Sequence, residues 1–223
     1  MKVTAIIPAG GSGSRLGLKT KKPFVMLSGK PILYYAIRAI EATDAVNEII
    51  VAAEKSQMSR VKALIKRFGF HKVKKVVAGG STRTASVKNC LDAIIGKPDI
   101  VLIHDAARPL VSVDMIAKAI KFALKYGACV AAVPESDTVK LAGQDGFVEK
   151  TIDRRNVFRA QTPQAFKTAL IIGAYRSLGV ERGATDDSSI LEDLGVRVKI
   201  LSGSYRNIKI TTREDLKIAE ALL

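Results

Sequence analysis

A glycine-rich loop with basic residues behind it is the first place where residue types and spacing suggest chemistry. Its glycines are Gly10, Gly11 and Gly13. Arg15 closes the loop and Lys22 follows it. Closely spaced glycines let the backbone approach a ligand and direct several N–H groups at one anion. The spacing fits neither a dinucleotide fingerprint, which needs glycine where Leu16 stands, nor a Walker loop. The loop therefore predicts an anion cradle, although a plain turn would explain the glycines alone.

A second polar group follows the apolar run Ile100–His104. Asp105 comes directly after it, and a carboxylate placed near bound phosphates requires a cation. Mg²⁺ prefers carboxylate, phosphate and water oxygens, so Asp105 is a candidate Mg²⁺ ligand. Strand alternation predicts that His104 faces the other way and packs in the core. Arg108 is expected to face phosphate, with a structural salt bridge as the alternative.

The elements that must position these residues alternate regularly along the chain. Strands are expected at Val3–Ile7, Glu48–Ala52, Val73–Val77, Ile100–His104, Cys129–Val133 and Val196–Leu201. Helices are expected at Ile32–Glu41, Met58–Phe68, Thr82–Ile95, Asp114–Lys125, Gln164–Leu178, Asp186–Leu194 and Arg213–Leu222. Continuously apolar strands between helices indicate an α/β, doubly wound, mostly parallel sheet between helix layers. Such Rossmann-like folds bind ligands at the carboxyl ends of their strands.

The stretch Pro134–Gln161 breaks this alternation. A turn at Gly143–Gly146 separates two short segments rich in β-forming residues, which predicts a projecting β-arm or, alternatively, an ordinary surface hairpin. Such a long excursion is uncommon in a compact domain unless it is functional.

Composition limits the class of protein. With 223 residues, the chain is expected to form a single domain over residues 1–223. The formal net charge of +15 is spread along the chain and accompanies no recognised nucleic-acid module, so we expect a solvated basic surface that attracts a small anionic substrate. No apolar run approaches the roughly 20 residues that a membrane span needs. The separated Cys90 and Cys129 favour free thiols, and hence the cytoplasm.

Several further motifs accompany the loop. They are Lys22-Pro23-Phe24, Gly79-Gly80-Ser81-Thr82-Arg83, His104-Asp105-Ala106-Ala107-Arg108-Pro109, Asp137-Thr138-Val139-Lys140, Gln161-Thr162-Pro163-Gln164 and Asn207-Ile208-Lys209-Ile210-Thr211. With these motifs, the chain resembles the nucleotide-sugar pyrophosphorylase superfamily. Over essentially its whole length, it is similar to the 2-C-methyl-D-erythritol 4-phosphate cytidylyltransferase family. The resemblance implies transfer of CMP from CTP to 2-C-methyl-D-erythritol 4-phosphate, releasing pyrophosphate, in non-mevalonate isoprenoid biosynthesis.

The resemblance also implies roles for particular residues. The catalytic residues would be Arg15, Lys22 and Lys209. The nucleotide would be held by Ala9, Gly10, Gly11, Gly13, Gly80, Arg83, Ser86 and Ala106. The second substrate would meet Asp105, Arg108, Thr138, Arg154 and Thr162, with Asp105 also binding Mg²⁺. The chain departs from the family at Lys21, where proline is usual, and at Ser81, where an acidic residue is common.

In similar enzymes the arm embraces a second subunit. The resemblance therefore implies a homodimer in which Thr138 and Arg154 complete the neighbour's site. Two other functions remain open from the sequence. One is a ribitol-5-phosphate cytidylyltransferase, which shares most of these motifs. The other, from a different class, is a non-catalytic protein that binds nucleotides or other polyanions.

Overall fold

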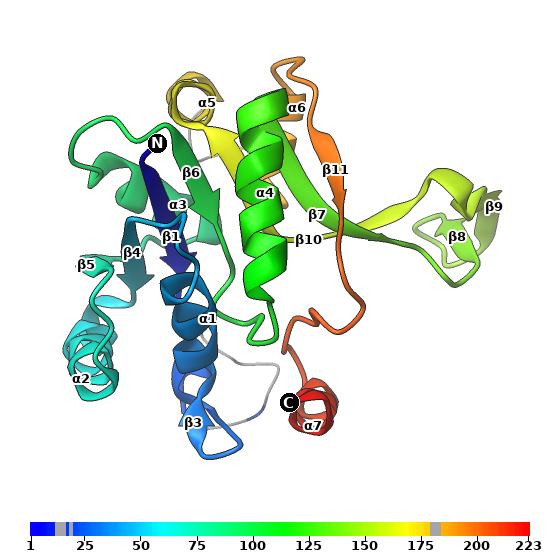
Figure 1. Cartoon of the computed structure of the whole chain (residues 1–223). Helices are drawn as coiled ribbons and strands as arrows, with labels where there is room; N and C mark the ends of the chain where they lie inside the picture. Colours follow the sequence, from blue (N-terminus) through cyan, green and yellow to red (C-terminus); the bar gives the residue numbers. More distant parts are fainter. Residues whose placement is uncertain (12–16, 18–19, 179–183) are drawn as a thin grey trace.

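A seven-stranded sheet lies between two layers of helices in the computed structural model, which describes residues 1–11, 17, 20–178 and 184–223 (Figure 1). The strands follow the order β11-β7-β10-β6-β1-β4-β5. They are β1 (Val3–Pro8), β4 (Glu48–Ala53), β5 (Val73–Ala78), β6 (Ile100–Ile103), β7 (Ala128–Pro134), β10 (Phe158–Lys167) and β11 (Lys199–Ser202). All neighbouring pairs run parallel except those of β10, so the predicted α/β fold with a mostly parallel sheet is confirmed.

Strand alternation explains why both faces of the sheet carry helices. In β1, Val3, Ala5 and Ile7 belong to one apolar cluster, whereas Ile6 belongs to the cluster on the other face. All four are fully buried. A strand that is apolar on both faces can be stable only when both faces are covered.

Each helix layer contributes its apolar stripe to one of these clusters. One layer holds α1 (Ile32–Glu41), α2 (Met58–Phe68) and α4 (Val113–Tyr126), and the other holds α3 (Arg83–Asp92), α5 (Thr168–Leu178) and α6 (Asp187–Glu192). The last helix, α7 (Arg213–Leu222), packs through Ala219 on a third, smaller cluster. No helix in the described part of the chain is both long and apolar enough to span a membrane.

Short elements connect these layers. A 3-10 helix at Lys22–Phe24 precedes the small hairpin of β2 (Met26–Leu27) and β3 (Lys30–Pro31), and further 3-10 turns lie at Lys55–Gln57 and Arg154–Asn156.

The predicted boundaries of several helices and strands differ from the observed ones by a few residues, as expected for helix and strand ends. For example, the last strand is Lys199–Ser202 rather than Val196–Leu201, and the α3 helix ends at Asp92 rather than Ile95.

The expected helix Gln164–Leu178 is wrong at its beginning. Residues Phe158–Lys167 form β10, which pairs antiparallel with both β6 and β7 in the middle of the sheet. Its polar residues and Pro163 obscured the strand pattern, because proline usually marks a strand edge or a bulge. The ladder with β7 indeed shifts register between Ala160 and Gln164.

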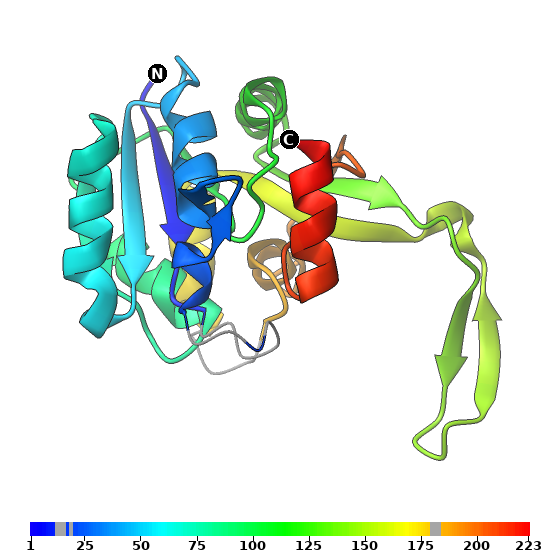
Figure 2. The same ribbon diagram turned by 90° about the horizontal axis from the view of Figure 1, so that it is seen from below.

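The excursion from the sheet is a hairpin arm, as predicted. Strands β8 (Val139–Ala142) and β9 (Val148–Ile152) pair antiparallel with each other and extend away from the sheet (Figure 2). Because β7 leads into the arm and β10 leads out of it, the chain returns beside β7 without a crossover helix. This connection explains the antiparallel direction of β10.

Candidate active site

A cavity of about 410 Å³ opens at the carboxyl ends of β1, β5 and β6. It is lined by Pro8, Ala9, Gly10, Gly11, Lys22, Pro23, Gly80, Ser81, Thr82, Arg83, Ser86, Asp105, Ala106, Ala107 and Lys209. These residues come from loops, strand ends and helix starts that are distant in the sequence and meet at one edge of the sheet. The cavity therefore lies where an open α/β sheet binds its ligands.

Most of the candidate residues from the sequence meet in this cavity. Ten of them line it: Ala9, Gly10, Gly11, Lys22, Gly80, Arg83, Ser86, Asp105, Ala106 and Lys209. Gly13 and Arg15 lie outside the residues that the structure describes.

The loop after β5 is held against the first turn of α3. Thr82 caps the helix by accepting a hydrogen bond from the Ala85 N–H. The Ser86 hydroxyl accepts from the Gly80 N–H at 3.1 Å and donates to the Thr82 carbonyl at 2.9 Å. A Cβ on Gly80 would lie 2.3 Å from that of Ala85, so only glycine fits there without displacement. Ser86 thus lies in an early helical turn and faces the preceding loop, as expected.

Asp105 is the one carboxylate among the described residues that line this cavity. It is nearly buried, yet its two oxygens contact Arg83 Nε at 2.8 Å and Lys209 Nζ at 2.7 Å. Burial alone would raise the pKa of Asp105, but the charges of Arg83 and Lys209 hold that pKa well below its ordinary value. Asp105 is therefore an ionised carboxylate that joins two basic residues distant in the sequence.

Lys209 reaches this position because its segment lies alongside the loop after β6 and is hydrogen-bonded to it. The Ile210 N–H donates to the Ala107 carbonyl at 2.8 Å, and Ile210 is fully buried. The Lys209 side chain, by contrast, is 41% exposed. Its ammonium group can therefore contact both Asp105 and a bound anion.

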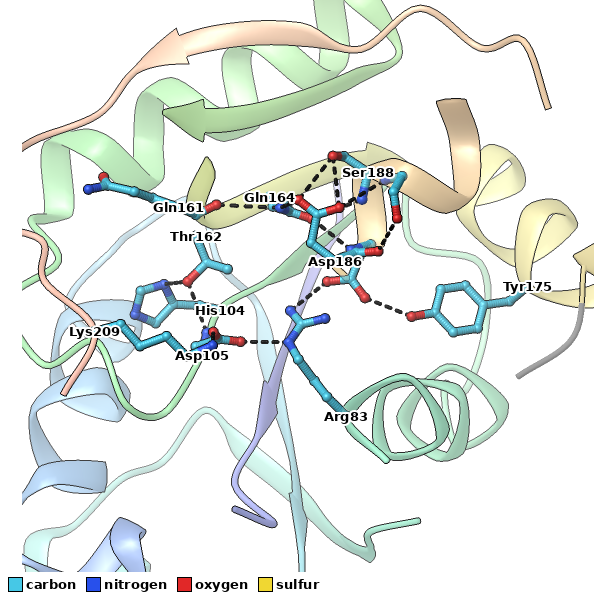
Figure 3. Close-up of polar contacts among 12 residues, drawn as sticks. Arg83, His104, Asp105, Gln161, Thr162, Gln164, Tyr175, Asp186, Ser188 and Lys209 are labelled. Carbon is cyan, nitrogen blue, oxygen red and sulfur yellow. Dashed lines mark hydrogen bonds and ion pairs between the residues drawn. The ribbon is translucent and has the colours of Figure 1, made fainter. Parts of the chain in front are cut away.

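Arg83 continues the chain of charges away from the cavity (Figure 3). Its Nη2 lies 2.7 Å from Oδ2 of Asp187, whose Oδ1 accepts a 2.7 Å hydrogen bond from the Tyr175 hydroxyl. Sequence reasoning missed both residues. Asp187 follows the N-cap Asp186 at a helix start, where an acidic residue is ordinary, and Tyr175 lies inside a helical pattern. Neither position carried a signal of its own.

His104 is packed in the core, as predicted, and supports Asp105 indirectly. Its Nε2 bonds to the Arg108 carbonyl at 3.0 Å, and its Nδ1 lies 3.0 Å from the Thr162 hydroxyl. That hydroxyl also accepts a hydrogen bond from the Asp105 N–H at 3.0 Å. Because a backbone carbonyl only accepts, His104 carries its proton on Nε2, and Thr162 donates to Nδ1. Burial lowers the pKa of His104 to about 4, so the ring is neutral.

A second cavity of about 160 Å³ adjoins the first and shares Arg83, Asp105 and Lys209 with it. Its other lining residues are Arg108, Ala160, Gln161, Thr162, Gln164, Thr185 and Asp186. Arg108 was expected to face phosphate or form a salt bridge. The structure places its guanidinium on two main-chain carbonyls, those of Asn207 at 2.7 Å and Ala160 at 3.3 Å, beside this cavity.

Two candidate residues lie outside the lining of both cavities within this chain. Thr138 and Arg154 are exposed on the arm, and Arg154 donates a hydrogen bond to the Ser136 carbonyl. Neither belongs to the lining residues of the two cavities. Within one copy of the chain, the arm residues therefore do not complete the site.

The donor set at Asp105 fits a cation that takes most of its ligands from phosphate and water. The described residues contain no group of three or more His, Cys, Asp or Glu side chains that could hold a metal. Mg²⁺ commonly binds proteins through one or two carboxylates together with substrate phosphates. Asp105 supplies the one carboxylate, and Lys22, Arg83 and Lys209 line the same cavity, where they could bind the phosphates that would provide the other ligands.

Comparisons with known proteins agree over nearly the whole chain. The family model IspD, described as 2-C-methyl-D-erythritol 4-phosphate cytidylyltransferase, matches residues 3–223. A protein of that name from Pelotomaculum thermopropionicum is 43% identical over 224 residues, covering 100% of this chain and 94% of the relative. Another from Clostridium acetobutylicum is 44% identical over 221 residues, covering 98% and 96%.

Solved structures give the same result for the fold. The 4-diphosphocytidyl-2C-methyl-D-erythritol synthase of Anaerococcus prevotii superposes with a TM-score of 0.86 at 33% identity, covering 99% of this chain and 95% of that one. The 2-C-methyl-D-erythritol 4-phosphate cytidylyltransferase of Thermus thermophilus gives a TM-score of 0.77 at 31% identity, covering 100% and 98%.

Proposed function

The chain belongs to the 2-C-methyl-D-erythritol 4-phosphate cytidylyltransferase family, and on this premise we propose that its larger cavity binds CTP and the adjoining one the polyol phosphate. The reaction is transfer of CMP from CTP to 2-C-methyl-D-erythritol 4-phosphate. Its products are 4-diphosphocytidyl-2-C-methyl-D-erythritol and pyrophosphate, and it acts in non-mevalonate isoprenoid biosynthesis.

The observation that carries this proposal is the shared wall of the two cavities. Arg83, Asp105 and Lys209 line both, so a phosphate group in either cavity meets the same charged residues. A nucleotidyl transfer requires this arrangement, because the acceptor phosphate must reach the α-phosphate of the nucleotide. A protein that only bound nucleotides would not need the second cavity.

Charge neutralisation and alignment are what this chain supplies to the reaction. A phosphate oxygen of the acceptor attacks the α-phosphorus of CTP, and pyrophosphate leaves. Because attacker and target are both anions, most of the catalysis comes from positioning and from stabilising negative charge. Lys22 and Lys209 bring ammonium groups to the cavity, and the backbone at Gly10, Gly11 and Gly80 can approach the phosphates closely.

Asp105 would hold Mg²⁺ together with oxygens of the triphosphate. The bound cation would neutralise phosphate charge and orient the leaving group. The residues of this chain would keep the Asp105 carboxylate ionised and fixed in orientation through its contacts with Arg83 and Lys209.

The arm would complete the site of a second copy of the chain. Its exposed apolar residues include Leu141, Phe147 and Val148, which are 49%, 75% and 60% exposed. An isolated two-stranded hairpin is at best marginally stable in water, so this surface needs a cover. A symmetric homodimer would cover both arms and bring Thr138 and Arg154 to the partner's second cavity.

The test of this function is pyrophosphate release from CTP with a panel of acceptors. The purified protein should be active with Mg²⁺, CTP and 2-C-methyl-D-erythritol 4-phosphate, and slower with UTP or ATP. A faster reaction with ribitol 5-phosphate would reassign the acceptor. Salt-sensitive binding of polyanions without pyrophosphate release from any acceptor would contradict an enzymatic function.

A further inference from the structure

A buried ion pair and tyrosine behind the larger cavity have no role in the function proposed above. Asp187 is fully buried at the first turn of α6, and Tyr175 is 2% exposed on α5. Consecutive contacts link Tyr175 to Asp187, Asp187 to Arg83, and Arg83 to Asp105. Figure 3 labels Tyr175, Arg83 and Asp105 of this series. These contacts join three helices of one layer, α5, α6 and α3, to the edge of the sheet that carries the site.

We propose that Asp187 and Tyr175 are positioning residues that hold the Arg83 guanidinium against Asp105, so that the Asp105 carboxylate keeps one orientation during the reaction. This inference rests on the proposed function, because it assigns the two residues to the cytidylyl transfer at the same site. Neither residue is among the described residues that line the two cavities, so both would act through Arg83.

The geometry of Arg83 supports this role. Its Nε contacts Asp105 Oδ1 at 2.8 Å, and its Nη2 contacts Asp187 Oδ2 at 2.7 Å. A guanidinium is planar, so two carboxylates on two of its nitrogens restrict both its position and the rotation of its plane. If Asp187 lost its charge, Asp105 would keep Arg83 only at Nε, and the guanidinium could turn toward a bound phosphate.

Tyr175 keeps Asp187 directed at Arg83. The Asp187 carboxylate is buried, and a buried carboxylate oxygen without a donor carries a large desolvation cost. Burial and the neighbouring Asp187 charge both raise the pKa of Tyr175, so its phenol stays protonated and donates. The backbone is fixed from the sheet, because the Asp187 N–H donates to Gln164 Oε1 at 3.1 Å.

The balance of charge argues against a purely stabilising role. Two cations, Arg83 and Lys209, face two carboxylates, Asp105 and Asp187, so the group is neutral as a whole. A buried ion-pair network of this kind contributes little stability compared with apolar packing of the same volume. Its distinctive effect is therefore to fix the orientation of the Arg83 and Asp105 side chains beside the cavity.

The experiment compares Asp187→Asn, Tyr175→Phe and the double variant with a matched control, Tyr34→Phe. Tyr34 is also nearly buried, and its hydroxyl accepts from Lys30 on the opposite face of the sheet. Each variant is characterised by kcat, KM for CTP, the Mg²⁺ concentration for half-maximal rate, and Tm. A second measurement, independent of turnover, follows the Nε–H proton of Arg83 by NMR hydrogen exchange.

Positioning predicts a specific pattern of kinetic changes. Asp187→Asn should lower kcat about 10- to 100-fold and raise the half-maximal Mg²⁺ concentration about 10-fold, as removal of a group supporting a ligand typically does. KM for CTP should change less than about 3-fold, because the atoms that line the cavity remain. Tyr175→Phe should lower kcat about 3- to 10-fold, and the double variant should match Asp187→Asn, because Tyr175 acts through Asp187. The Arg83 Nε–H should exchange faster in all three.

Other results would overturn the inference without affecting the proposed function. If kcat per folded site, Mg²⁺ dependence and Arg83 exchange all stay at the values of Tyr34→Phe while only Tm falls, the two residues are structural. Additive losses in the double variant would show that Tyr175 acts independently of Asp187. A wild-type protein without pyrophosphate release would instead contradict the proposed function itself, and the exchange measurement would then decide the positioning of Arg83 alone.

Discussion

Lys21 Nζ forms a 2.9 Å ion pair with Glu54 Oε2, which ties this lysine to the residue that follows β4. The next residue, Lys22, begins a 3-10 helix and lines the larger cavity. Two adjacent lysines that the sequence leaves nearly equivalent thus have different surroundings. Of the two, Lys22 is the one that can contact a phosphate in the cavity.

We expect Lys22→Ala to lower kcat roughly 10²- to 10³-fold, because it removes one group that stabilises charge in the transition state. Lys21→Ala should lower kcat far less, since it breaks an exposed ion pair outside the cavity. Steady-state pyrophosphate release, with Tm as the control for folding, distinguishes the two. Equal losses from both substitutions would contradict the assignment of Lys22 as the catalytic lysine.

His104 should make the stability of the protein depend on pH in mildly acidic solution. Burial lowers its pKa to about 4 from the ordinary 6.5. Above pH 6.5 both folded and unfolded states carry a neutral ring, so the stability that depends on a neutral His104 is fully present. Between pH 6.5 and 4 only the unfolded chain binds the proton, and the free energy of unfolding should fall by about 1.4 kcal/mol per pH unit.

Denaturant unfolding at several pH values, compared between wild type and His104→Gln, isolates this contribution from that of the carboxylates. The free energy of unfolding of wild type should fall toward that of His104→Gln as the pH falls from 6.5 to 4. His71→Gln, at an exposed position, is the matched control and should keep the wild-type dependence. A wild-type slope that persists in His104→Gln would show that other groups are responsible.

Gly80→Ala should disturb the loop between β5 and α3, which we propose binds the nucleotide. The new methyl group would lie 2.3 Å from the Ala85 Cβ and 3.0 Å from the Ala85 carbonyl carbon, so loop and helix must separate. We expect a loss of about 1–3 kcal/mol in stability, as for an overpacked site, and a raised KM for CTP. Gly173→Ala is the control, because a Cβ added at Gly173 would meet no atom within 4 Å. Unfolding curves together with KM measurements test the prediction, and an unchanged KM would exclude this loop from nucleotide binding.

Mixing two inactive variants tests whether the arm serves a partner's site. Lys22→Ala disables the larger cavity, and Arg154→Ala removes the proposed contribution of the arm. If subunits reassort randomly, half of the dimers are mixed, and each of these has one site with both defects and one with neither. Activity should therefore rise from near zero to roughly a quarter of wild type.

Subunit exchange is verified separately, by mass spectrometry of differently tagged chains. No recovery of activity after complete exchange would mean that Arg154 serves its own chain's site or none. A chain that stays monomeric at all concentrations would contradict the homodimer directly.

The sequence by itself determined six of the seven strands of the sheet, the helix layers and most of the residues that line the cavity. Local signals sufficed there, because apolar runs such as Val3–Ile7 need cover on both faces, and closely spaced glycines need a special backbone. The rule that parallel strands present their carboxyl ends at one edge then brought the Gly10 loop, Gly80 and Asp105 together without further information.

The tertiary structure alone decided the features that depend on contacts between distant segments. The β10 strand pairs inside the sheet because the arm returns the chain beside β7, although Pro163 and its polar neighbours argue locally against a strand. Lys21 and Lys22 are adjacent and identical in type, so only their three-dimensional surroundings distinguish them. Asp187 lies 104 residues from Arg83, and the energy of that ion pair depends on burial and distance, which no local pattern encodes.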